Sequence, residues 1–122
     1  MGKAKQINHN SFNNIRAKEA YWLGMIAADG HVYSDKRYPK SKLIGLNTKD
    51  EEIVNNFKNF LESEHKITKE KTGYFKVGAT SKDITDRLET FGITERKSLT
   101  LEIKNIPELY ISHFIRGILD GD

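Results

Sequence analysis

The feature of this sequence that most constrains its fold is an eight-residue pattern that occurs twice. One copy begins at Trp22 and the other at Ile115, and each has glycine at its third position and aspartate at its eighth. Apolar residues at helical spacing accompany both copies. The repeat predicts two similar helices, one early and one at the end of the chain, with Asp29 and Asp122 as their matched final residues.

Small residues in both copies predict that the two helices pack closely. Gly24 and Ala28 in the first copy, and Gly117 and Gly121 in the second, are each four positions apart. Small residues at this spacing let two helix backbones approach each other. A glycine inside a helix costs about 1 kcal/mol relative to alanine, so its presence at the same place in both copies favours a packing role.

The matched aspartates suggest a metal site, because two helices packed in this way place their final residues side by side. Carboxylates are hard oxygen ligands that suit Mg²⁺, which also takes phosphate oxygens. A bound Mg²⁺ can activate water and stabilise a leaving oxygen in phosphodiester hydrolysis. An aspartate beside glycine is also common in ordinary turns, and from chemistry alone the two readings are equally weighted.

The remaining sequence predicts helices that alternate with hairpins. Gly30 is expected to end the first helix in the left-handed conformation, and Gly92 to stop a shorter helix near the end of the unit. The apolar stripes of the helices match a sheet that needs a cover on one face, which is an α+β arrangement with an antiparallel sheet. The predicted elements are a loose polar lead-in (1–12), a helix (17–28), a hairpin (31–37 and 42–47, turning at Pro39 and Lys40), a helix behind a capping box at 48–51, a second hairpin (66–71 and 74–79), a helix (81–91), a connector (93–106) and a final helix from Pro107.

The stretch Glu19–Gly30, and within it Trp22–Gly30, resembles the LAGLIDADG motif of homing endonucleases, and the α-β-β-α-β-β order resembles that family's half-domain. The resemblance implies an α+β fold, an αββαββα LAGLIDADG half-domain with a four-stranded antiparallel saddle-like sheet covered by helices on one face. It implies a half-domain over residues 1–106, with its first motif at 22–30. Residues 107–122 are then the truncated start of the second motif helix.

The resemblance also implies an activity. Such enzymes lay two saddles along the major groove of double-stranded DNA, and one acidic residue from each motif helix binds a divalent metal where both strands are cut. Carried over by position, Asp29 and Asp122 are the catalytic residues and the ligands of Mg²⁺ or another divalent cation. The chain is then the DNA-binding half of a metal-dependent, site-specific endonuclease encoded by an intron, an intein or a free-standing gene.

Only one such unit stands between the two motifs, so whether this chain alone is an enzyme stays open. The second saddle would come from a missing C-terminal half or from a homodimer formed through helix 17–28, unless the final helix covers that helix within one chain. Two other hypotheses remain: a non-cleaving, maturase-like or regulatory nucleic-acid binder, and an inactive remnant.

If the sheet lies in the groove, one face of each strand carries core residues and the other carries residues that contact DNA. Ile44, Leu46, Val77 and Ala79 are predicted to point inward. Lysines at the first hairpin tip suit phosphate contacts, although they could equally keep the tip soluble. The candidate DNA-binding residues are His31, Tyr33, Lys36, Arg37, Lys42, Asn47, Lys66, Thr68, Tyr74 and Lys76.

Composition limits the possible partners and location only loosely. The 20 Lys and Arg residues exceed the 17 Asp and Glu residues, and a net charge of +3 permits a nucleic-acid partner without requiring one. The absence of cysteine excludes disulfides and thiolate metal sites. No apolar run approaches the roughly 20 residues that cross a bilayer, and no secretory pattern opens the chain. We expect an intracellular protein without a membrane partner, in the cytoplasm of a prokaryote or phage-infected cell, or in an organelle.

Overall fold

The computed structural model describes residues 6–35, 38–94 and 102–121 of the chain. The described strands form one antiparallel sheet of four strands in the order β1-β2-β4-β3, and the predicted α+β class is confirmed. In chain order the elements are α1 (Ala17–Asp29), β1 (Gly30–Asp35), β2 (Tyr38–Thr48), α2 (Glu51–Leu61), β3 (Thr68–Lys69), β4 (Phe75–Thr80), α3 (Lys82–Glu89), the 3-10 helix η1 (Glu108–Tyr110) and α5 (Ile111–Gly121).

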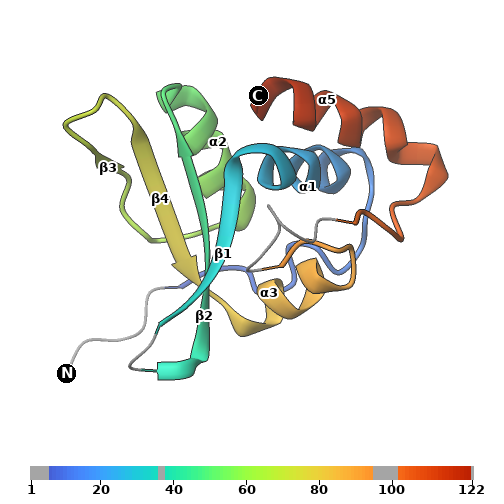
Figure 1. Ribbon diagram of the computed structural model, residues 1–122, viewed down its shortest axis with the longest axis horizontal. Coiled ribbons are helices and arrows are strands. Elements are labelled where there is room, and N and C mark those ends of the chain that lie inside the picture. The colour runs from blue at the N-terminus through green and yellow to red at the C-terminus, as the bar shows by residue number, and fades with distance from the viewer. Residues whose placement is uncertain (1–5, 36–37, 95–101, 122) are drawn as a thin grey trace.

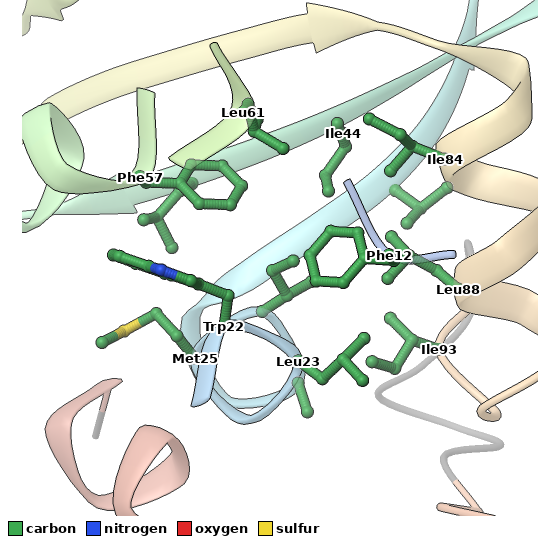
Figure 2. Packing of buried hydrophobic residues seen from close by; sticks show 14 of the residues in the cluster. Phe12, Trp22, Leu23, Met25, Ile44, Phe57, Leu61, Ile84, Leu88 and Ile93 are labelled. Carbon is green, nitrogen blue, oxygen red and sulfur yellow. The ribbon is translucent and has the colours of Figure 1, made fainter. Parts of the chain in front are cut away.

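The helices lie on one side of the sheet in two tiers (Figure 1). Helices α1, α2 and α3 contact the strands, whereas α5 lies on α1. The core fills the space between the sheet and the first tier (Figure 2). Its largest fully buried side chains include Phe12, Leu23, Met25, Ile44, Phe57, Leu61, Ile84, Leu88 and Ile93. The opposite sheet face is therefore left without a helical cover.

Gly30 joins α1 to β1 for a reason that differs from the predicted one. Gly30 is the C-cap of α1, so the predicted stop is confirmed, but its φ of −93° is not left-handed and the expected conformation is wrong. A Cβ at this position would lie 2.9 Å from the Cα of Ile26 and 3.0 Å from the carbonyl oxygen of Gly45. Glycine is needed because the backbone of this joint passes close to both α1 and β2.

The first hairpin turns earlier than predicted. Strand β2 begins at Tyr38, which pairs with Asp35, so the turn expected at Pro39 and Lys40 is wrong. Ser34 pairs with Lys42, which leaves residues 39–41 without partners on β1, as an irregular bulge. A bulge suits Pro39 because proline has no N–H to give to the sheet ladder.

The second helix is capped two residues later than the predicted capping box. Asp50 is its N-cap, and the Asp50 Oδ1 accepts a hydrogen bond from the Glu52 N–H at 3.0 Å. Thr48 instead accepts from the Asp50 N–H at 3.3 Å. The aspartate therefore satisfies an otherwise unpaired amide in the first turn of α2.

The second hairpin and the following helix match the prediction in part. Strand β3 has only two residues, because the chain before Thr68 does not pair with β4. Gly73 turns this hairpin with φ 92°, and its N–H donates to the Glu70 carbonyl at 3.0 Å. Gly92 follows the end of α3 with a φ of 90°, at the position predicted to terminate that helix.

The lead-in is packed rather than loose. Phe12 is fully buried, and Ile7 and Ile15 are less than one-tenth exposed. The Asn8 N–H donates to the Leu61 carbonyl at 2.8 Å, and the Arg87 Nε donates to the Phe12 carbonyl at 2.9 Å. This segment closes one end of the core, and its few apolar residues were too sparse among polar neighbours to show periodicity.

Candidate functional site

The two motif helices pack against each other through their glycines. A Cβ at Gly24 of α1 would overlap the carbonyl oxygen of Phe114, and a Cβ at Gly117 of α5 would overlap that of Tyr21. The two contacts are equivalent, because each glycine meets the carbonyl oxygen of the residue three positions before the glycine of the other helix. A local two-fold axis therefore relates the helices, and α5 occupies the side of α1 that a second copy would need for pairing through helix 17–28.

The same pairing brings the ends of the two motifs together. A Cβ at Gly121 would lie 3.1 Å from the Cβ of Ala28. These residues directly precede Asp122 and Asp29 in the sequence. Asp29 is half-buried as the last residue of α1, and Asp122 lies outside the described residues.

The donor set fits a divalent cation only together with a substrate. Within the described part of the chain, no three His, Asp or Glu side chains gather closely enough to hold a metal ion by themselves. Mg²⁺ commonly keeps several waters and takes one or two carboxylates together with substrate phosphates. Asp29 could supply only one such carboxylate, so a complete coordination shell would need the second motif and a phosphate.

The open sheet face carries the residues predicted to contact DNA. Val32, Ile44, Leu46, Val77 and Ala79 are buried under the helices, as their alternation predicted for the last four. Because neighbouring residues of a strand point to opposite faces, the intervening residues lie on the uncovered face. They include His31, Tyr33, Gly45, Asn47, Lys76 and Gly78.

Two glycines on that face make room for aromatic rings. Gly45 of β2 pairs with His31 on one side and with Gly78 of β4 on the other. A Cβ at Gly45 would lie 2.6 Å from the Nε2 of His31, and one at Gly78 would lie 3.3 Å from the Tyr33 hydroxyl. The two rings are 5.1 Å apart and inclined by 30°. Both therefore lie flat across β2 toward β4 instead of projecting from the sheet.

The alternation that predicts Ile44, Leu46, Val77 and Ala79 to point inward leaves Gly45 and Gly78 on the outward face, but it gives them no role. The available signal was their position inside strands, where glycine often marks the close approach of another group. We call His31, Tyr33, Gly45 and Gly78 the glycine trough.

An open depression of about 410 Å³ adjoins the trough near the β3–β4 hairpin. Three predicted DNA-binding residues, Lys66, Thr68 and Lys76, line it. Two lysines and one carboxylate give it a basic balance that suits a phosphate. The lining residues are His65, Lys66, Thr68, Glu70, Lys76 and Gly78.

The other predicted contact residues are dispersed. Tyr74 packs against Lys49, whose Nζ lies 5.3 Å from the ring centroid. Lys42 is half-buried and pairs with Ser34, beside the bulge near the turn of the first hairpin. Asn47 has a buried Oδ1 with no hydrogen-bond partner among the described residues, and such an acceptor suits a donor from a ligand. Lys36 and Arg37 lie outside the described residues.

A polar link that does not involve the motif aspartates Asp29 and Asp122 joins α1 to α5. The Tyr21 hydroxyl donates to Asp120 Oδ2 at 2.8 Å, and the Arg116 guanidinium lies 4.3 Å from the Tyr21 ring centroid. Burial, followed by the hydrogen bond to Asp120, raises the pKa of Tyr21 to about 12.

These features define an α+β protein with an uncovered antiparallel sheet and a glycine-packed pair of helices. A LAGLIDADG-like domain profile matches residues 16–83, more than half of the chain. The chain belongs to the LAGLIDADG family, which confirms the predicted membership.

Among solved structures, the chain is similar to I-SmaMI, described as bound to uncleaved DNA target in the presence of calcium ions. The identity is 17% and the TM-score 0.40, over 63% of this chain. This chain spans 28% of the length of that one. No curated protein matches the sequence. In the described ranges, no helix is long and apolar enough to cross a membrane.

Proposed function

We propose that the chain is the DNA-binding half of a divalent-metal-dependent, site-specific double-strand DNA endonuclease of the homing type. The observation that carries the proposal is the reciprocal packing of α1 on α5. It brings Ala28 against Gly121, directly before the two motif aspartates. Family membership supports a nuclease.

The uncovered sheet face is the proposed DNA-binding surface. A major groove about 12 Å wide admits a two-stranded ribbon. His31, Tyr33 and Asn47 offer hydrogen-bonding groups to base edges. Lys66 and Lys76 offer cations to phosphates at the depression, and such contacts position the duplex.

Asp29 and Asp122 are the residues proposed to hold the cation, each from one motif helix. When bound with phosphate oxygens, Mg²⁺ would supply an activated water and neutralise the leaving oxygen. In this proposal the helix pair would hold the two carboxylates near the local two-fold axis, so that each aspartate would serve one DNA strand.

The outer face of α5 supports a second unit. Ile115 and Leu119 are 49% and 68% exposed, whereas their α1 counterparts, Trp22 and Ile26, are buried in the core. By the local two-fold, α5 would present to a second unit the face that α1 presents to its own core. We propose that residues 1–106 form one half-domain and that 107–122 begin the next, whose body comes from the same polypeptide or a separate one.

A cleavage assay on a randomised plasmid library tests the proposal. The chain is combined with a second unit, fused after α5 or added as a separate polypeptide, and incubated with Mg²⁺ or with chelator, and new DNA ends are sequenced. We expect recurrent double-strand ends with Mg²⁺ only. Asp29→Asn should lower cutting at least a hundredfold, because its neutral amide is a poor Mg²⁺ ligand.

The matched control is Glu89→Gln, which neutralises an exposed carboxylate at the end of α3. Its cutting should equal that of the unmodified chain. Equal cutting by Asp29→Asn would remove the metal role. Sequence-selective binding without cutting would favour the non-cleaving alternative.

A further inference from the structure

Three α5 residues in the helix contact differ from their α1 counterparts in a way that breaks the local two-fold. The glycines at the crossing are common to both helices and cannot distinguish them. The three pairs, α1 residue first, are Leu23 and Arg116, Ala27 and Asp120, and Ala28 and Gly121.

Two of the differences form a link that is made only once. Tyr21 of α1 donates to Asp120 of α5 at 2.8 Å and carries the Arg116 guanidinium on its ring. Under the two-fold, the place of Tyr21 is taken by Phe114, and that of Asp120 by Ala27. Phenylalanine and alanine side chains cannot make this hydrogen bond, so the link has one direction.

The third difference concerns space. A Cβ at position 121 would lie 3.0 Å from the Sδ of Met25 and 3.1 Å from the Cβ of Ala28. If α1 of a second copy took the place of α5, its Ala28 would bring such a Cβ. The neighbours would have to yield, and well-packed contacts resist added methyl groups.

The same replacement would leave Tyr21 facing Leu23 and Ala27 of the second copy. The hydroxyl would lose its carboxylate acceptor, and the ring would lose its cation. Exposed polar links contribute little in absolute terms, but the choice of a partner depends on the difference between two pairings.

We propose that Tyr21, Arg116, Asp120 and Gly121 select α5 as the partner of α1 and disfavour pairing of α1 with a second copy of itself. This inference rests on the helix contacts alone and is independent of DNA cleavage. The partner of α1 is then a unit that begins with an α5-type helix. It is not a second copy of α1 in a symmetric dimer through helix 17–28.

A double-mutant cycle tests the polar link. Tyr21→Phe removes the hydroxyl, and Asp120→Ala installs the residue that α1 carries at the matched position. Each single variant should raise the unfolding equilibrium constant roughly fivefold, the usual effect of losing one hydrogen bond. The double variant should raise it little further, because both changes remove the same link. Independent, multiplicative effects would overturn the proposed link.

Cysteine cross-linking tests the choice of partner, and it is clean because the chain has no cysteine. In the full chain, Ala28→Cys places a thiol where two α1 helices would meet under the two-fold. At equilibrium in a glutathione buffer, intermolecular disulfide measures self-pairing. We expect little dimer, and at least a fivefold rise when Arg116→Leu, Asp120→Ala and Gly121→Ala are added, which give α5 the residues of α1.

Two controls separate partner choice from general loosening. Glu89→Cys on α3 reports random collisions and should cross-link equally with and without the three α5 changes. Asp86→Ala removes the Lys82–Asp86 pair, 2.9 Å long and remote from the helix pair, and should leave the dimer yield of the Ala28→Cys variant unchanged. An unchanged dimer yield after the three α5 changes would overturn the proposal. A high dimer yield of the Ala28→Cys variant without the three α5 changes would also overturn the proposal.

Discussion

At the scale of single residues, glycine serves two different purposes in this chain. Gly73 and Gly92 have positive φ values of 92° and 90°, which other residues rarely adopt. Gly24 and Gly117 have ordinary helical backbone, and glycine is required there because another helix backbone fills the space of a Cβ. The first role follows from local turn chemistry, whereas the second depends on a partner more than 90 positions away.

Tyr21 should make stability depend on alkaline pH. Its pKa is about 12 in the folded protein against an ordinary value of 10, so the folded state holds its proton more tightly. Its contribution is complete below pH 10 and is lost as pH rises from 10 to 12. Urea unfolding at several pH values should therefore show a shallower decline for Tyr21→Phe than for the unmodified chain.

Gly45→Ala should rearrange the glycine trough without unfolding the protein. The added methyl would lie 2.6 Å from the Nε2 of His31, the far end of a flexible side chain that can rotate away. We expect the free energy of unfolding to change by less than about 1 kcal/mol. NMR should show shifted ring resonances of His31 and Tyr33. Unmoved resonances would contradict the flat placement of the rings.

At the scale of elements, helix α1 is buried on two sides, from Trp22 through Ala27, so it has no single apolar stripe. Amphipathic periodicity predicted α2 and α3 well, because each buries one stripe against the core. It failed for the lead-in and for β3. Phe12 and Ile7 are isolated apolar residues that fill one end of the core, and isolated residues have no period. Strand β3 pairs over only two residues, although the pattern before it favoured a full strand.

Gly24→Ala should weaken the attachment of α5 to α1. The new methyl would overlap the backbone carbonyl of Phe114, which cannot rotate away, so the helices must separate. We expect a loss of about 1–3 kcal/mol in the free energy of unfolding, as for other overpacked sites. Gly121→Ala meets side chains at 3.0–3.1 Å and should cost less. Equal losses in urea titrations would contradict the close crossing at Gly24.

At the scale of the whole molecule, the two faces of the sheet differ. One face packs on the core under the helices, and the other carries the glycine trough and the basic depression. Exposed apolar residues of η1 and α5 form another surface on the side of α5 away from α1: Leu109, Ile111, Ile115 and Leu119.

Removing a lysine of the depression should change how DNA binding depends on salt. If Lys76 contacts one phosphate, Lys76→Gln should reduce the slope of log K against log salt by about 0.9. Fluorescence anisotropy with a mixed-sequence duplex measures this slope. Lys58→Gln, on α2 at the opposite side of the sheet, should leave it unchanged. An equal reduction for both lysines would indicate binding that does not use the sheet face.

The sequence by itself determined the helix–hairpin order, the buried faces of β2 and β4, and the matched glycines and aspartates with the close helix packing that they predict. These are set by periodicity and local chemistry, which neighbours in the chain reveal. Only the tertiary structure decided that α1 and α5 pair within one chain, that Gly45 and Gly78 receive the rings of His31 and Tyr33, and that Tyr21 reaches Asp120. Those features depend on which distant backbones approach each other, and no local pattern encodes that approach.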